Sequence, residues 1–355
     1  MLNRNRFLNI QQFVIDPEHE YEEICKKLNG TLIKFGTYQV INVLDIRKTI
    51  LEEGESYLKN KIAKLNVFFS FVFLEMTEEE KAILEDKIIE CYKQKGITED
   101  NKSLFKDDCS SNILKKQKFK TAEDMPLLED LYKLLKADKK MKKYATILNP
   151  YIKGRLSYLN KLTNVNIENS LVVVDIHELN ESDLPMIMFI IMDYFWDRIR
   201  ENRTEKKILY LDEVWKMIYK NPMTAEFVFN LFKTIRKYGG GATAVTQDIN
   251  DFFLLEDGKY GKGILNNSSI KCLFQMEEND IYTLEKVLQL SEEEKIRLVN
   301  MERGTMLLQA GRNHLIANVI AAAKEHFYIT TDSEELKNNM KGMSIKNEKN
   351  INSIR

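Results

Sequence analysis

One short segment constrains the fold more than any other, because an apolar run at 208–211 leads directly into Asp212 and Glu213. Such a run is typical of a buried strand in a parallel sheet. Ligands bind outside the carboxyl ends of the strands in these sheets, so the segment predicts two carboxylates at a binding edge. In nucleotide hydrolases, the first carboxylate of such a pair holds Mg²⁺, and the second orients or deprotonates the attacking water. The alternative interpretation is a strand that precedes a helix with acidic residues in its first turn.

Other apolar runs, at 13–16, 171–176 and 242–248, also reach a polar residue at or next to their end. Segments with helical features alternate with these runs, at 18–28, 184–199 and 225–238. The alternation predicts the α/β class, with a mostly parallel, doubly wound sheet between helices. Because such sheets gather the ends of their strands, we expect Asp16, Asp212 and Gln247 at one edge. Further short strands are predicted at 31–35, 38–43 and 270–275, with a hairpin formed by 304–312 and 315–320.

The middle of the chain differs in composition and pattern. Glycine is rare, charged residues are dense, and apolar residues recur at helical spacing. These features predict an all-helical insertion at 47–160, between two parts of the α/β domain at 1–46 and 161–332. The polar tail at 333–355 is expected to be disordered. The apolar stripe at 127–135 needs a packing partner, and no Gly/Ser linker isolates the segment. We therefore expect the insertion to pack against the sheet domain.

The composition excludes few partners but argues against a metal-ligand or disulfide framework. The 53 basic and 54 acidic side chains nearly balance, so nucleic acid is neither favoured nor excluded. The cysteines form no C-x-x-C pair, and a reducing compartment fits them best. The histidines are equally scattered and are interpreted as structural or exposed. These residues are Cys25, Cys91, Cys109, Cys272, His19, His177, His314 and His326.

The most apolar stretches, at 67–74 and 184–196, are shorter than the roughly 20 residues that a membrane-spanning helix needs. Polar residues also interrupt the start of the chain, so no signal-peptide core is predicted. These features predict no transmembrane segment and a cytoplasmic location, with any membrane association made through partners.

Several segments resemble, in the same order, the VirB/TraC-type ATPases of conjugative type IV secretion systems. The similarity extends from the first strand to about residue 320. It is carried by Phe13-Val14-Ile15-Asp16-Pro17-Glu18-His19-Glu20-Tyr21, Thr163-Asn164-Val165, Leu211-Asp212-Glu213-Val214-Trp215, Arg236-Lys237-Tyr238-Gly239-Gly240-Gly241 and Thr246-Gln247-Asp248.

The resemblance implies a RecA-like P-loop domain of the FtsK/HerA branch that binds ATP and Mg²⁺. Asp212 would bind the metal, and Glu213 would act on the attacking water. Gln247 would sense the γ-phosphate, although it could instead cap a strand end. Arg236 would be an arginine finger for a neighbouring subunit, although it could instead pair locally near a helix end. Asp16, Glu18, Gln247 and Arg312 are the expected nucleotide-binding residues.

The resemblance also implies partners. The intact protein would be a homo-oligomer, a hexamer, on the cytoplasmic face of a transfer channel. It would contact other channel subunits, and single-stranded DNA is a further candidate partner. ATP hydrolysis would drive DNA or protein transfer, or channel assembly.

One departure from the family is the absence of a G-x-x-x-x-G-K-[ST] phosphate loop from these residues. In the family, that loop lies just upstream of the strand that ends in Asp16. We therefore expect a portion of a longer ATPase, inactive by itself. The alternatives are a non-hydrolytic scaffold subunit of the secretion machinery and a DNA-translocating relative of the coupling-protein type.

Overall fold

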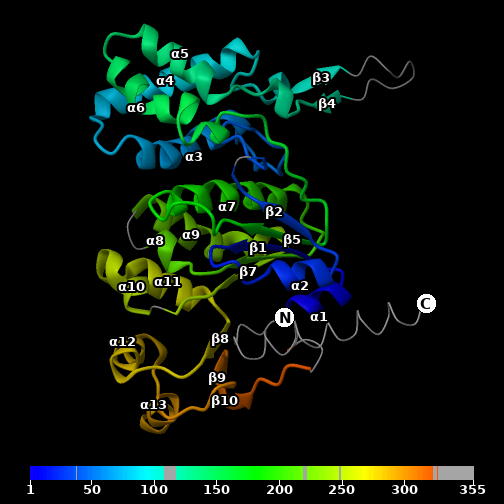
Figure 1. Ribbon diagram of the computed structural model, residues 1–355, viewed down its shortest axis with the longest axis vertical. Coiled ribbons are helices and arrows are strands. Elements are labelled where there is room, and N and C mark those ends of the chain that lie inside the picture. The colour runs from blue at the N-terminus through cyan, green and yellow to red at the C-terminus, as the bar shows by residue number, and fades with distance from the viewer. Residues whose placement is uncertain (37, 108–116, 219–221, 248, 323–325, 327–355) are drawn as a thin grey trace, which may run out of the picture.

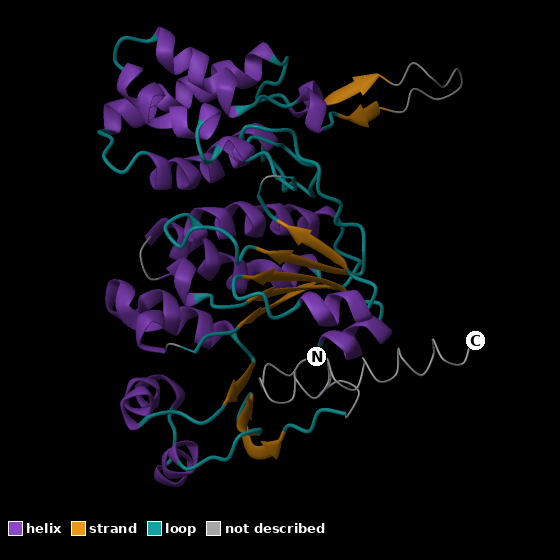
Figure 2. Ribbon diagram, viewed as in Figure 1, coloured by secondary structure: helices purple, strands orange, loops and turns teal. Residues whose placement is uncertain are grey.

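The computed structural model describes residues 1–36, 38–107, 117–218, 222–247, 249–322 and 326. The tail predicted to be disordered, 333–355, lies outside these residues. Three tiers follow one another along the long axis of the molecule (Figure 1). A helical region lies at one end, a helix-covered parallel sheet lies in the middle, and a small region with its own antiparallel sheet lies at the other end (Figure 2).

The central sheet has the strand order β2-β5-β1-β6-β7, and all of its strands are parallel. In register, Val14 of β1 lies between Val173 of β5 and Tyr210 of β6. The predicted parallel α/β architecture is therefore confirmed. The strands are β1 (Gln11–Asp16), β2 (Thr31–Lys34), β5 (Leu171–Asp175), β6 (Lys207–Leu211) and β7 (Gly240–Ala244).

Alternation along the strands directs side chains into two separate cores. Phe13 faces the larger core and stacks on Phe195 of α7, with 4.6 Å between ring centroids. Val14 faces a smaller core with Leu2 of α1 and Cys25 of α2. Helices thus cover both faces of the sheet (Figure 1). The helices of this tier are α1 (Leu2–Phe7), α2 (Glu22–Lys27), α7 (Leu184–Glu201), α8 (Trp215–Ile218), α9 (Pro222–Thr234), α10 (Ile249–Leu254) and α11 (Lys259–Asn267).

The helical region contains α3 (Tyr57–Val72), α4 (Glu78–Gln94), α5 (Leu128–Ala137) and α6 (Lys142–Lys153). The region is not all-helical, which corrects the prediction for 47–160. A hairpin pairs β3 (Phe105–Asp107) with β4 (Gln117–Phe119), and Phe105 and Phe119 meet edge to face across it. Strands of three residues are too short to show an alternating pattern, so the sequence could not reveal them.

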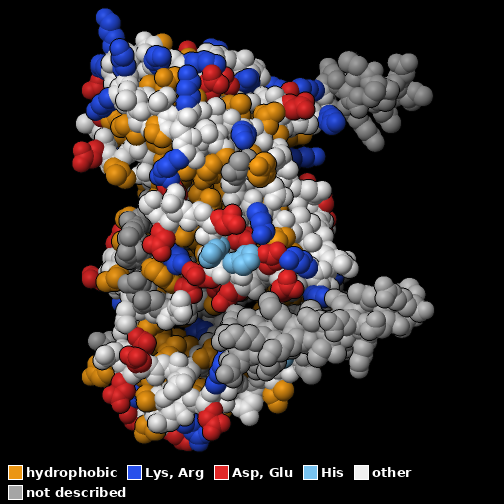
Figure 3. Space-filling model, in the orientation of Figure 1, with side chains coloured by type: hydrophobic (Ala, Val, Ile, Leu, Met, Phe, Trp, Pro, Cys, Tyr) orange, Lys and Arg blue, Asp and Glu red, His pale blue; other side chains and the backbone are white. Residues whose placement is uncertain are grey.

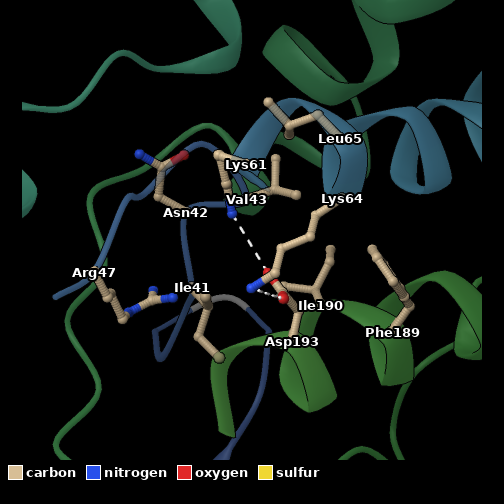
Figure 4. Close-up of a pocket in the computed structure, with 10 residues that line it drawn as sticks. All are labelled: Ile41, Asn42, Val43, Arg47, Lys61, Lys64, Leu65, Phe189, Ile190 and Asp193. Atoms are coloured by element: carbon tan, nitrogen blue, oxygen red, sulfur yellow. Dashed lines mark hydrogen bonds and ion pairs between the residues drawn. The ribbon is translucent and has the colours of Figure 1, made fainter. Parts of the chain in front are cut away.

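The helical region packs directly on the sheet domain, as predicted, through a buried ion cluster between α3 and α7 (Figure 4). Lys64 Nζ lies 2.5 Å from carboxylate oxygens of both Asp193 and Asp197. Lys61 Nζ lies 3.4 Å from Asp193 Oδ2. Burial by itself would raise the pKa of Asp193, but Lys64 and Lys61 hold that pKa below its ordinary value. The cluster fixes the position of the helical region on α7.

The third tier contains a separate antiparallel sheet in the order β10-β9-β8. The hairpin predicted near the end of the chain is confirmed as β9 and β10. The predicted strand at 270–275 forms as β8, but it joins this sheet rather than the parallel one. Among the described residues, no helix combines the length and apolarity needed to cross a membrane. The elements are β8 (Ile270–Leu273), α12 (Glu278–Leu288), α13 (Glu292–Val299), β9 (Thr305–Ala310) and β10 (Asn313–Asn318).

Candidate functional site

Three of the predicted site residues lie at one edge of the parallel sheet. Asp16 ends β1, Asp212 directly follows β6, and Gln247 lies three residues beyond β7. The three strands are parallel neighbours, so their carboxyl ends share an edge. The chain stays paired beyond the strands, because the Val245 amide donates to the Leu211 carbonyl at 2.9 Å. The predicted placement is confirmed, whereas the roles of the residues remain predictions.

Asp212 is buried beside a second carboxylate. Asp212 is only 6% exposed, and its Oδ1 accepts a hydrogen bond from the Glu213 amide at 3.1 Å. The hydroxyl of Tyr21 also donates to the Asp212 carboxylate. Burial, followed by the charge of Glu213, raises the pKa of Asp212 to about 6. A carboxylate in this environment is stabilised by a proton or by a bound cation.

Glu213 adopts a backbone conformation that is unusual for its residue type. Its φ is +47°, in the left-handed region, at the junction between β6 and α8. The residue is buried, and its Oε2 accepts a hydrogen bond from the indole Nε1 of Trp215. Strained backbone of this kind is concentrated at functional sites, where the surrounding structure holds it in place. The hydrogen bond from the indole holds the Glu213 carboxylate in place.

The loop after β1 is organised by Asp16, which is fully buried. The Asp16 carboxylate accepts hydrogen bonds from the amides of Glu20 and Tyr21, at 3.1 and 3.0 Å. Burial and the nearby charge of Asp175 raise the pKa of Asp16 above its ordinary value. Glu18 is exposed and forms an ion pair with Lys216, which lies three positions after Glu213 in the chain. Asp16 therefore shapes the loop, and Glu18 ties it to the chain that follows β6.

Glu20 and Tyr21 also lie at this edge, although the sequence pattern did not identify them as site residues. Partial burial, followed by the charges of Asp16, Glu18 and Glu213, raises the pKa of Glu20. Burial and the charge of Asp212 raise the pKa of the Tyr21 hydroxyl. Both residues belong to the segment 13–21 that carries the family resemblance, which was the available signal. Tyr21 joins the β1 loop to Asp212, and Glu20 adds a further negative charge.

Neither predicted arginine lies with this cluster in the described structure. Arg236 is exposed in the 3-10 turn Ile235–Tyr238 before β7, so it lies at the amino edge of the sheet, opposite Asp212. Gly239, with φ +71°, then turns the chain into β7, where a Cβ would lie 2.5 Å from the Arg203 carbonyl. Arg312 is exposed in the turn between β9 and β10, and no described interaction joins it to Asp212.

In metal-free protein, Asp212→Asn is expected to increase stability at pH 7.5 by roughly 2–3 kcal/mol. The folded protein binds the Asp212 proton more tightly than the unfolded chain, because the pKa rises from 3.8 to about 6. The wild type therefore loses stability as pH rises from about 4 to above 6, and the variant does not. Urea unfolding with EDTA at pH 3.5 and 7.5 measures the difference, which should vanish at the lower pH. Parallel pH profiles would contradict the expectation, and exposed Asp86→Asn is the control.

Comparisons with known proteins agree with the fold. The family model of the TraG P-loop domain matches residues 7–338. The solved structure of VirB4 of Thermoanaerobacter pseudethanolicus is similar, with a TM-score of 0.79 and 29% identity, covering 91% of this chain and 85% of that one. Protein TraC of Escherichia coli (strain K12) is 29% identical over 109 residues, which make up 30% of this chain and 12% of TraC.

These similarities confirm the resemblance to VirB/TraC-type ATPases and the RecA-like fold that it implied. The matched region is a small part of TraC, so the whole length of that protein is not represented here. The family model, in contrast, spans nearly the entire chain from the end of α1 into the tail. This chain therefore belongs to the TraG P-loop domain family.

Proposed function

We propose that this chain is the ATPase portion of a conjugative-transfer or type IV secretion machine. ATP hydrolysis would drive transfer of DNA or protein, or assembly of the channel. Membership of the TraG P-loop family and similarity to VirB4 and TraC support the proposal. The observation that carries it is the buried Asp212-Glu213 pair at the sheet edge where Asp16 and Gln247 also lie.

The charges at this edge fit a divalent cation. Asp212 has a raised pKa because it is buried next to Glu213, and Glu20 and Asp16 add to the negative field. Asp212 would hold Mg²⁺, and Glu213 would accept a proton from the attacking water. Gln247, exposed at the end of β7, would contact the γ-phosphate. Bound Mg²⁺ would neutralise charge on the phosphates.

The phosphate cradle is the part that these 355 residues do not supply, since they contain no G-x-x-x-x-G-K-[ST] string. In the described structure, β7 pairs on one side with β6 and has no strand on its other side. A further parallel strand can add there, and its carboxyl end would then lie beside Gln247. A loop after that strand would place its amides opposite the Asp212-Glu213 pair. The open side of β7 is therefore the position where we propose that a phosphate loop would join the site.

A binding experiment tests this division of the site. The 355-residue chain is compared with the same chain joined to a strand, phosphate loop and helix of the G-x-x-x-x-G-K-[ST] type ahead of α1. We expect Mg²⁺-ATP affinity to rise at least about tenfold in the longer chain, because backbone amides and the loop lysine bind the phosphates. Equilibrium titration with a fluorescent ATP analogue measures it. Equal affinity of the two chains would contradict the proposal. If both affinities were negligible, the result would favour the scaffold alternative.

The proposal includes an oligomer and a cellular setting. A hexamer would bring Arg236, on the amino edge of one subunit, toward the carboxyl edge of the next. The machine would work at the cytoplasmic face of the membrane through other channel subunits. Direct contact with single-stranded DNA belongs to the coupling-protein alternative. Binding of a single-stranded oligonucleotide that weakens steeply with salt would favour that alternative.

A further inference from the structure

A second cluster of metal-ligating groups lies at the same sheet edge, on the opposite side of β1 from Asp212. His19 Nδ1 is 2.6 Å from Asp175 Oδ2, and His19 Nε2 is 2.9 Å from Glu22 Oε2. One ligand atom from each of these residues lies within 4.8 Å of the other two. Histidine side chains gather among acidic and basic ones on the face in Figure 3. Residues that are scattered in the sequence thus converge on one point.

Three different elements position this cluster. Asp175 ends β5 and is only 6% exposed, so its carboxylate is held in place. Glu22 begins α2. His19 lies between them with φ +61°, a left-handed conformation that is uncommon outside glycine and directs the imidazole toward both carboxylates. The ring of His177 lies 5.9 Å from that of His19, measured between centroids.

We propose that His19, Glu22 and Asp175 form a binding site for a divalent transition-metal ion of the Zn²⁺ or Co²⁺ type. Imidazole and carboxylate groups are ligands for such ions, at about 2.0–2.2 Å. Two ligands at that distance lie at most about 4.4 Å apart, and the ligand atoms of the three residues lie within 4.8 Å of one another. His19 gives one ring nitrogen to the metal, and Glu22 and Asp175 each give one carboxylate oxygen.

The lysines around Glu22 do not prevent metal binding. Lys26 Nζ lies 2.6 Å from Glu22 and Lys34 Nζ lies 3.4 Å from it. Both lysine side chains are more than half exposed, and exposed ion pairs contribute only about 0–1 kcal/mol. A divalent ion can therefore displace them. The hydrogen bond from Lys26 also lowers the pKa of Glu22, which keeps its carboxylate in the ionised form that binds metals.

The site is separate from the proposed Mg²⁺ position. Asp175 lies on β5, and Asp212 follows β6, with β1 between these strands. The two sites are nevertheless coupled through charge, because Asp175 raises the pKa of Asp16. A cation bound at Asp175 would offset that effect. The new site does not depend on ATP hydrolysis, so it can be tested without it.

The test is Co²⁺ binding to the EDTA-treated, desalted 355-residue chain at pH 7.5. Visible absorption reports the ligand set, and competition with a chromophoric chelator gives the affinity. Wild type is expected to bind one Co²⁺ at this site, and Zn²⁺ should displace it. His19→Gly is expected to weaken binding at least about tenfold. Glycine suits the positive φ at position 19, so the variant should fold, and thermal melting checks this. Glu22→Gln should also weaken binding.

Two controls separate this site from others. His314→Ala removes a histidine that pairs with one carboxylate, Glu294 at 2.6 Å, and should leave Co²⁺ affinity unchanged. Asp212→Asn removes the proposed Mg²⁺ ligand and should change Co²⁺ affinity much less than His19→Gly does. The proposal is overturned if wild type shows no saturable binding, or if His19→Gly binds as tightly as wild type. Binding lost only in Asp212→Asn would overturn it as well.

Discussion

Substituting Glu213→Gln is expected to lower the rate of ATP hydrolysis by about 10²–10⁴-fold, the usual contribution of a positioned general base. The comparison uses the chain that carries a phosphate loop. Affinity for Mg²⁺-ATP should change little, because the role proposed for Glu213 is to act on the water and not on the phosphates. The change keeps the size of the side chain and its contact with the Trp215 indole. Phosphate release at saturating ATP measures the rate, and equilibrium titration measures binding.

A matched control is Glu178→Gln, because Glu178 is an exposed carboxylate just after β5, near the same edge of the sheet. That variant should hydrolyse ATP at the wild-type rate. The chain without a phosphate loop should show negligible hydrolysis at the same concentration. Robust hydrolysis by the 355 residues alone, sensitive to Glu213→Gln, would mean that they contain a phosphate site of another kind.

The second large effect is expected at Arg236. Arg236→Ala should lower the rate of hydrolysis by roughly 10³-fold, the lower end of the effect expected for loss of an arginine finger. It should not weaken nucleotide binding. The physical reason is the position of Arg236 on the amino edge, opposite Asp212, where it can act only on another subunit's site. The guanidinium is exposed, and it forms no ion pair within the part of the chain that the structure describes.

Mixing two inactive variants tests this action between subunits. Arg236→Ala supplies an intact Glu213, and Glu213→Gln supplies an intact Arg236, so mixed oligomers contain some complete sites. Partial recovery of phosphate release on mixing is the expected result. Lys233→Ala, which removes an exposed cation one turn earlier, is the control and should stay active. If mixing restores nothing while Arg236→Ala is inactive by itself, Arg236 does not act in a neighbouring subunit.

The sequence alone determined the type of fold and the position of the central carboxylates. Apolar runs that end in acidic or amide residues predicted parallel strands, and β1, β5, β6 and β7 each overlap one of those runs. This works because the burial of a strand and the polarity of its end are local properties of the chain. The segments that resemble the family lie close to Asp16, Asp212 and Gln247, which share one edge. Local pattern was therefore enough to place these residues together.

Other features depend on which elements become neighbours, and only the tertiary structure decided them. His19 and Asp175 are 156 residues apart and meet because β5 pairs with β1. The histidines were interpreted as isolated because spacing along the chain carries no information about that pairing. In the same way, Lys64 and Asp193 look like surface charges on two amphipathic helices until α3 packs on α7 and buries them.

The two sheets illustrate the same limit. The run at 270–273 has the composition of a parallel strand, but β8 pairs with β9, and among the described residues one side of β7 stays open. Arg236 and Glu213 are 23 positions apart, yet β7 must begin at the edge opposite to the one where β6 ends. The apolar composition of a strand favours its burial in a sheet, whichever strand lies beside it. Which neighbour it pairs with is set by long-range packing and chain connection, which no local pattern contains.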